Sequence, residues 1–382
     1  MTDVVITATS VVSAGRPDVA NGQEDEAALA LGVPAVARAA TGDDDPDFPD
    51  DRKGQLASAA LAGVAVPRGA RVGLFLGTGL SSLTPKELEL DLFPYLQGGQ
   101  FDREALARDL RRDRPAPRRH EPERVTRVLA RRLGAVVAET NFAACAAAAQ
   151  SIAAAHRAVA RGEVDVALAG GHDSMLHPIG YLSFVVLGAL SLTRPRPFDV
   201  RRDGFLIGEG AALLQLERED DARARGAPVL ARLLGSGTSV DAHNVTAPHP
   251  EGRGAVLAMR RALRDAGLAA SDVDYVNAHG TGTPVGDVAE ARAVVEVLGD
   301  VPVSSFKGAI GHTIAAAGAV ELAWCVRMLG ESRTWATVGL EQPDPEIRCN
   351  LLTRHAERAP GVVLSNSFGF GGQNCALVIA CP

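Results

Sequence analysis

The chain has 382 residues, more than one small hydrophobic core usually holds, so two domains or one large duplicated unit are expected. Hydrophobic residues make up 46% of the chain and charged residues 22%, and this composition excludes disorder or a coiled coil along the whole chain. The net charge of −7 argues against a nucleic-acid surface that extends over the chain.

Membrane insertion and secretion are not expected either. The longest apolar run, from Tyr181 to Leu192, is too short to cross a bilayer, and the first residues lack the basic segment that begins a signal peptide. Five cysteines are scattered without the spacing of a disulfide framework or a metal site, which fits a reducing compartment. The sequence therefore predicts a cytoplasmic protein with no membrane or nucleic-acid partner.

Strand-like and helical segments alternate in the first half of the chain. The expected strands lie at residues 4–6, 71–77, 135–142 and 164–169. An arginine-rich stretch at 103–132 contains two helical segments separated by prolines. The segment 145–160 is alanine-rich and has almost no polar face, so it is expected to form a buried helix.

The second half repeats this order. Its expected strands lie at residues 274–278, 303–306, 362–365 and 375–380. A second alanine-rich helix is expected from Thr313 to Ala323, and the charged segment 217–228 separates the two halves. The repetition predicts a duplicated α/β protein with halves at residues 1–220 and 221–382, and with both alanine-rich helices packed at the centre.

Cys145 lies between a predicted strand and the start of the first buried helix. The N-terminus of a helix stabilises negative charge and lowers the pKa of a thiol there, which is what a nucleophile requires. The alternative is a small, inert core residue.

Two histidines follow strands in the second half. His279 lies in the sequence Asn-Ala-His-Gly-Thr-Gly-Thr, where glycines allow a ligand to approach the backbone and the hydroxyls of Thr281 and Thr283 can hydrogen-bond an amide. His312 lies between the strand at 303–306 and the second alanine-rich helix. A turn containing a histidine with satisfied hydrogen bonds is the alternative for each.

Lys307 is one of only three lysines among 39 basic residues. A lysine that persists in such an arginine-rich chain suggests a place where arginine does not fit. Its neighbours in the sequence are uncharged, and Glu321, in the second alanine-rich helix, is a candidate ion-pair partner.

One cysteine, two histidines and a lysine at such junctions are suited to thiol-based acyl transfer. Together with a glycine-rich turn at 366–374, they make the sequence resemble the β-ketoacyl synthases of the thiolase superfamily, of the elongating type with a Cys-His-His triad. The matching segments lie in family order at residues 144–146, 196–211, 277–287, 307–318 and 365–374. The resemblance implies the thiolase-like fold, a five-layer α-β-α-β-α arrangement with two buried central helices.

The resemblance also implies a role for each matching residue. Cys145 would accept an acyl chain from a thioester, and His279 and His312 would stabilise the enolate that forms when a malonyl thioester loses carbon dioxide. Lys307 would orient the site together with Glu321.

Further roles concern the substrate's path. The backbone N–H groups of Cys145 and Phe370 would form an oxyanion hole, and Phe370 would also gate the acyl pocket. Thr281 and Thr283 would hold the phosphopantetheine arm, and Asp287 would support the site. No metal or redox cofactor is expected, because the phosphopantetheine arrives on the carrier protein.

The implied reaction is the decarboxylative Claisen condensation of an acyl thioester with malonyl-acyl carrier protein, in fatty acid or polyketide biosynthesis. The acyl carrier protein is the expected partner, and the chain is expected to form a homodimer or a heterodimer with a ketosynthase-like subunit. Because such carriers are acidic, local arginines are expected to dock them, and the candidates are Arg118, Arg119, Arg124 and Arg127.

Three alternatives remain open at the level of sequence. A chain-length-factor-like partner subunit usually lacks the nucleophile, which this chain has at Cys145. A thiolase-fold acyltransferase or thiolase favours a second cysteine near the C-terminal glycine loop, where Cys375 lies. A non-catalytic binding protein would not be acylated rapidly at Cys145.

Overall fold

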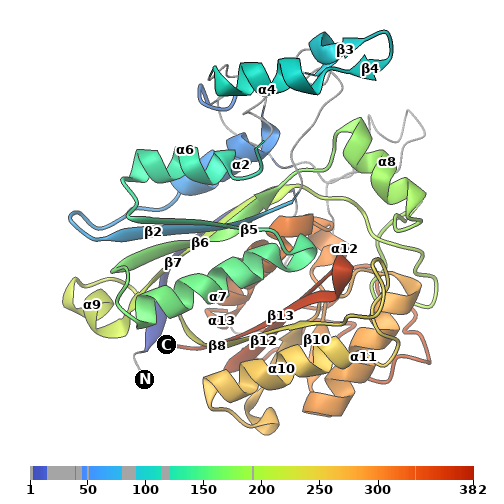
Figure 1. The fold of residues 1–382 in the computed structure, drawn as a ribbon. Coiled ribbons are helices and arrows are strands. Elements are labelled where there is room, and N and C mark those ends of the chain that lie inside the picture. The colour runs from blue at the N-terminus through green and yellow to red at the C-terminus, as the bar shows by residue number, and fades with distance from the viewer. Residues whose placement is uncertain are drawn as a thin grey trace.

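A computed structural model describes residues 3–14, 39, 45–49, 51–79, 92–112, 121–191, 193–331 and 333–382. Within these residues eleven strands are hydrogen-bonded in the order β11-β10-β9-β12-β13-β8-β1-β7-β6-β2-β5. The ribbon shows that this sheet folds into two stacked layers with helices between them and on both outer faces (Figure 1). None of the helices in these ranges is long and apolar enough to span a membrane.

The first layer has the strand order β5-β2-β6-β7-β1. Strands β5, β2 and β6 are parallel, and β7 and β1 continue the layer antiparallel. The strands are β1 (Val4–Ser13), β2 (Val72–Thr78), β5 (Val137–Asn141), β6 (Val166–Asp173) and β7 (Gly210–Arg218).

The second layer repeats this pattern with the order β10-β9-β12-β13-β8. Strands β10, β9 and β12 are parallel, and β13 and β8 continue antiparallel. The short strand β11 (Asn350–Leu351) extends the layer beyond β10, and residues 4–6 of β1 pair with residues 231–233 of β8 to join the two layers. The strands are β8 (Ala231–Val240), β9 (Tyr275–Asn277), β10 (Pro302–Ser304), β12 (Val362–Gly369) and β13 (Gln373–Ala380).

All eight predicted strands are present; most boundaries shift by up to four residues, and β1 extends seven residues beyond its predicted end. The sequence interpretation missed β7, β8 and the two-residue strands β3, β4 and β11. In β7 both faces are buried, so its residues do not alternate in polarity, and β8 contains glycines that mask its pattern.

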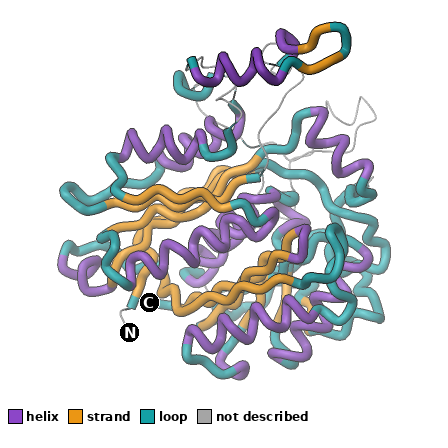
Figure 2. The backbone as a smooth tube through the Cα atoms, in the orientation of Figure 1, coloured by secondary structure: helices purple, strands orange, loops and turns teal. Residues whose placement is uncertain are grey.

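The helices complete three layers around the two sheet layers (Figures 1 and 2). α2 and α6 cover the outer face of the first sheet layer, α7 and α13 lie between the layers, and α10 and α11 cover the second. Their bounds are α2 (Arg52–Ala62), α6 (Arg124–Leu133), α7 (Ala147–Ala160), α10 (Arg253–Ala266), α11 (Pro284–Leu298) and α13 (Ala317–Leu329). The remaining elements are α4 (Arg103–Arg111), α8 (Pro178–Val186), α9 (Glu219–Ala224), α12 (Lys307–Ile310) and the hairpin β3 (Leu96–Gln97) and β4 (Gln100–Phe101).

The two alanine-rich helices lie at the centre, as the sequence predicts. Nearly every residue of α13 is buried, and α7 contacts strands of both layers. Small side chains let the two helices approach closely: a Cβ atom added at Gly318 would lie 2.8 Å from the Cβ atom of Ala149. Small residues at this crossing therefore bring together the beginnings of both helices, where the candidate site lies.

The repeated strand order and the paired central helices support an internal duplication. We propose that the chain divides into the halves 1–220 and 221–382, with the boundary inside α9 and before β8.

Candidate active site

A pair of equivalent turns positions the site at the beginnings of the two central helices. Cys145 lies in a 3₁₀ turn (Ala144–Ala146) that leads into α7, and a matching turn (Ile314–Ala316) leads into α13. The first residue of each turn has a positive φ, 47° at Ala144 and 49° at Ile314. This conformation is uncommon for residues other than glycine and often occurs at functional sites.

These turns are in contact, and they bring together the three residues of the predicted triad. Nε2 of His312 lies 3.1 Å from Sγ of Cys145. His279 follows β9, and its ring centre lies 5.3 Å from that of His312, with the ring planes nearly perpendicular. The thiol sulfur and one ring nitrogen of each histidine lie within 4.8 Å of one another.

The predicted pair of Lys307 and Glu321 lies close enough to the triad for the charge of Lys307 to act on all three residues. Nζ of Lys307 is 2.5 Å from Oε1 of Glu321, and both side chains are buried. Nδ2 of Asn277 donates to the other carboxylate oxygen at 3.0 Å. Burial raises the pKa of Glu321, and the Lys307 ammonium opposes that rise.

Burial opposes ionisation of the Cys145 thiol. Burial raises the pKa of its thiol to about 12, although the charge of Lys307 acts in the opposite direction. A helix N-terminus contributes at most ~2 kcal/mol, about 1.5 pKa units, which does not bring such a thiol near neutrality. Burial therefore acts against the expectation that the helix N-terminus is the main source of the thiolate, and that expectation stays a prediction.

Both histidines are neutral at pH 7. Burial, with the charge of Lys307 as a further cause, lowers the pKa of His279 and of His312 well below the ordinary value. A neutral imidazole can accept a proton from the Cys145 thiol or donate its own N–H to an oxyanion. The positive charge of Lys307 also disfavours a metal ion between Cys145, His279 and His312. That the reaction needs no metal ion stays a prediction.

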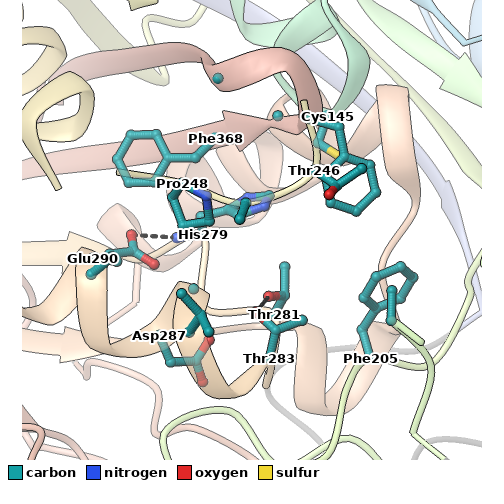
Figure 3. Close-up of a pocket in the computed structure, with 18 of the residues that line it drawn as sticks. Cys145, Phe205, Thr246, Pro248, His279, Thr281, Thr283, Asp287, Glu290 and Phe368 are labelled. Atoms are coloured by element: carbon teal, nitrogen blue, oxygen red, sulfur yellow. Dashed lines mark hydrogen bonds between the residues drawn. The ribbon is translucent and has the colours of Figure 1, made fainter. Parts of the chain in front are cut away.

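Asp287 and Glu290 support the loop that carries His279. Asp287 accepts hydrogen bonds from the backbone N–H groups of Gly282, at 3.0 Å, and Phe198, at 2.7 Å. The carboxylate of Glu290 accepts hydrogen bonds from the backbone N–H groups of His279 and Gly280, at 2.8 and 2.7 Å (Figure 3). The sequence analysis does not identify Glu290, although it lies one helical turn after Asp287. Burial raises the pKa of Asp287 to about 6 and that of Glu290 to about 7.

A cavity of about 290 Å³ leads to the triad. Cys145, His279 and His312 line it, as do Thr281 and Thr283. The two threonine hydroxyls lie 3.0 Å apart and beside His279, as Figure 3 shows. Hydroxyls on the wall of a narrow cavity suit an extended ligand with amide groups, which is the role predicted for them.

Phe370 also lines the cavity, at the beginning of a 3₁₀ turn (Phe370–Gly372) after β12. Its ring centre lies 6.3 Å from that of Phe184, within an apolar cluster that contains Cys145. A Cβ atom added at the preceding residue, Gly369, would lie 3.1 Å from the backbone N of Cys145. The two backbone segments expected to form the oxyanion hole are therefore adjacent.

A second buried lysine was not assigned to the site from the sequence. Nζ of Lys53 lies 2.8 Å from Oδ1 of Asp173, and both side chains are buried. The other oxygen of Asp173 accepts from the backbone N–H of Ala315 at 3.1 Å, in the turn that follows His312. Lys53 and Lys307 are thus both in buried ion pairs. The rarity of lysine in the sequence therefore indicates buried, paired positions in both of these cases. The third lysine, Lys86, lies outside the described residues.

The thiolase alternative required a second cysteine in the site. Cys375 is instead fully buried on β13, in the main core cluster, and is not among the described residues that line the cavity. The structure therefore does not bring Cys375 to the triad.

Two of the candidate docking arginines contact carboxylates and carbonyls of their own chain. A guanidinium nitrogen of Arg124 lies 3.3 Å from a carboxylate oxygen of Asp51, and one of Arg127 lies 2.7 Å from a carboxylate oxygen of Glu121. Both belong to α6, on the outer face of the first sheet layer (Figure 1). Arg118 and Arg119 lie outside the described residues, so docking by these four arginines stays a prediction.

Two family models match the chain. The model "Beta-ketoacyl synthase, N-terminal domain" matches residues 133–222, and "Beta-ketoacyl synthase, C-terminal domain" matches residues 230–341. Together they span more than half of the chain and contain Cys145, His279, Lys307 and His312.

Curated relatives agree with these models. A mitochondrial 3-oxoacyl-(acyl-carrier-protein) synthase of Arabidopsis thaliana is 43% identical over 252 residues, 62% of this chain and 55% of the relative. 3-Oxoacyl-(acyl-carrier-protein) synthase 2 of Rhizobium meliloti is 42% identical over 248 residues, 62% of this chain and 59% of the relative. The chain thus matches somewhat more than half of the length of these relatives.

Solved structures of ketosynthases match the whole chain. A β-ketoacyl synthase from Burkholderia phymatum superposes with a TM-score of 0.85 at 28% identity, with complete coverage of both chains. The ishigamide ketosynthase/chain length factor superposes with a TM-score of 0.82 at 28% identity, covering 100% of this chain and 99% of that one. The predicted thiolase-like fold is confirmed, and the chain belongs to the β-ketoacyl synthase family.

Proposed function

We propose that the protein is a ketosynthase. It catalyses the decarboxylative Claisen condensation of an acyl thioester with malonyl-acyl carrier protein, in fatty acid or polyketide biosynthesis. The observation that carries this proposal is the meeting of a thiol and two neutral imidazoles within 4.8 Å, at a cavity lined by paired threonine hydroxyls. The names of the curated relatives, which are 3-oxoacyl-(acyl-carrier-protein) synthases, support it.

The first half-reaction transfers the acyl group to Cys145. Because the buried thiol is protonated, its sulfur attacks the thioester carbonyl as Nε2 of His312, 3.1 Å away, takes the proton. The new C–S bond replaces the bond to the phosphopantetheine sulfur, which leaves with the proton. The N–H groups of Cys145 and Phe370 stabilise the oxyanion formed in between.

The second half-reaction forms the carbon–carbon bond. A malonyl thioester in the cavity loses carbon dioxide, and the electron pair of the broken bond forms an enolate. Its oxygen accepts hydrogen bonds from His279 and His312, in the tautomers that carry a proton on the nitrogen facing the cavity. The enolate carbon attacks the acyl group, the bond to the sulfur of Cys145 breaks, and the departing thiolate takes up one proton from the solvent. The positive charge of Lys307, held by Glu321, stabilises the anionic states.

A two-step experiment tests this function. Intact-protein mass spectrometry after incubation with acyl-carrier thioesters should show one acyl group on the parent and none on Cys145→Ala. Malonyl-acyl carrier protein should then release a β-ketoacyl product that is two carbons longer. Acylation without elongation would instead indicate an acyltransferase. A chain that is not acylated at all would fit a chain-length-factor-like subunit or a binding protein.

We further propose a dimer, with an identical or a ketosynthase-like subunit. β5 is an edge strand of the sheet, and Val136 and Phe142, which flank it, are 60% and 50% exposed. An edge strand with exposed apolar flanks favours pairing with another chain. The five cysteines are all free, which supports the proposal of a reducing, cytoplasmic location.

A further inference from the structure

The mouth of the cavity is bordered by exposed apolar side chains from three separate segments. At the C-terminal end of α8, Val186 is 85% exposed, and the next residue, Leu187, is 45% exposed and lines the cavity. Val285, at the beginning of α11, is 54% exposed and also lines the cavity. Val245 is 77% exposed; it precedes Thr246, another lining residue, and its carbonyl accepts from Gly371 at 2.7 Å. We call these four residues the apolar rim.

No lysine or arginine is among the described residues that line the cavity, so the lining offers an acidic partner no positive charge. Of the acidic lining residues, Asp287 and Glu290 are buried and Asp241 is partly exposed. Arg202 lies beneath the rim, where its guanidinium donates to the carbonyl of Pro284 at 2.9 Å. Its side chain is only 6% exposed and is paired with Asp344, so it offers little charge to a docking protein.

We propose that the acyl carrier protein docks on the apolar rim through an apolar surface of its own, and not through the arginines of α6. This inference rests on the proposed function, because that function requires a carrier whose phosphopantetheine reaches Cys145. The carrier is favoured over a second copy of this chain as the occupant, because a second copy seated on the rim would cover the mouth through which the substrate enters. The exposed edge at β5 offers a second copy a separate surface.

An apolar interface has a distinct signature in solution. Burial of apolar surface depends little on ionic strength, whereas attraction between exposed charges is screened at distances beyond the Debye length. A carboxylate placed in the rim would have to be desolvated on docking and would also repel an acidic carrier.

The test uses the full chain and one acyl group presented in two ways, on the carrier protein and as a small pantetheine thioester. Val186→Asp and Val245→Asp change rim residues that do not line the cavity. Each is expected to raise KM for the carrier-bound thioester about tenfold, which corresponds to ~1.4 kcal/mol. Acylation of Cys145 by the small thioester should stay at the parent rate.

Two controls sharpen the result. Val295→Asp places the same charge at another exposed valine, on α11 but away from the described lining of the cavity, and should leave both substrates unaffected. Reversal of the charge at Arg124 and Arg127 should likewise leave KM for the carrier unchanged. With the parent, a rise in salt from about 50 mM to about 500 mM should change that KM by less than about twofold.

Several outcomes would overturn the inference. They are a steep salt dependence, a larger effect of the arginine variants than of the rim variants, or equal losses with both forms of the substrate. A fall to monomer mass on light scattering in Val186→Asp would show that a second copy covers the rim. Failure of the proposed function is distinguishable, because the parent itself would then either not be acylated by either substrate or be acylated by both without elongating the chain.

Discussion

Nε2 of His312 lies 3.1 Å from Sγ of Cys145, although the two residues come from different halves of the chain. The contact exists because equivalent turns before α7 and α13 meet at the centre of the molecule. Since the thiol is buried and protonated, this contact gives the nucleophile its nearest proton acceptor among the predicted site residues.

We expect His312→Ala to slow acylation of Cys145 by about 10²-fold or more, because a general base typically contributes that much to a rate. Quenched time points analysed by intact-protein mass spectrometry measure this step alone. His279→Ala is the matched control, and it should be acylated at nearly the parent rate yet fail to elongate the chain. If His312→Ala were acylated as fast as the parent, the helix N-terminus would be the source of the thiolate after all.

Lys307→Arg tests whether the site requires a compact cation. Lys307 is fully buried against Glu321, and the larger planar guanidinium would overfill the space, at a cost of about 1–3 kcal/mol in the free energy of unfolding. We expect condensation to fall by about 10²–10³-fold, because the charge would no longer lie behind the triad. Product formation and thermal unfolding are the measurements.

Lys53→Arg is its matched control, since Lys53 is also buried and paired with a carboxylate, but its charge acts on His172 and His177, whereas that of Lys307 acts on the triad. It should lose a similar amount of stability while keeping most of its condensation rate. If Lys307→Arg condensed as fast as the parent, the scarcity of lysine would have no bearing on the chemistry.

Glu290 predicts a particular dependence of stability on pH. Its pKa rises from 4.5 to about 7 in the fold, so the folded state binds the proton more tightly than the unfolded chain does. The stabilisation from this group is therefore complete below about pH 4.5 and is lost as the pH rises through about 7. The matching rise for Asp287, to about 6, acts in the same direction.

Glu290→Gln removes this titration but also leaves a backbone N–H at the His279 loop without its carboxylate acceptor. The variant should thus be less stable than the parent by a larger margin at about pH 5 than at about pH 8. Urea unfolding of both proteins at the two pH values measures the difference. A margin that is the same at both would show that Glu290 keeps an ordinary pKa in the fold.

The proposed dimer predicts a mass of two chains by light scattering at micromolar concentration. Replacement of both Val136 and Phe142 by Asp would place charges beside the edge strand β5 and should shift the protein toward the monomer. Circular dichroism should show that the secondary structure is retained. A parent that is already monomeric would remove the basis for this interface.

Much of the architecture was readable from local sequence patterns. Eight strands and both central helices are where short apolar runs and alanine-rich segments indicated them, because these patterns record burial that the whole element shares. Cys145, His279, His312 and Lys307 were singled out because each residue type is rare or reactive and follows a strand. Whether they met in one place depended on the fold.

Only the tertiary structure decided the remaining features. The pKa of the Cys145 thiol depends on how completely other segments bury it, and this burial raises the pKa, against the direction that the helix terminus suggested. Glu290 was overlooked because an acidic residue in a helix usually faces water, whereas here it is buried against the His279 loop and Asn366. The apolar rim joins residues from α8, from the loop after β8 and from α11, so its existence depends on which side chains the packed chain leaves uncovered. By itself the sequence determined the elements and the chemical groups, because these depend on neighbours along the chain; distances, burial and protonation depend on neighbours in space.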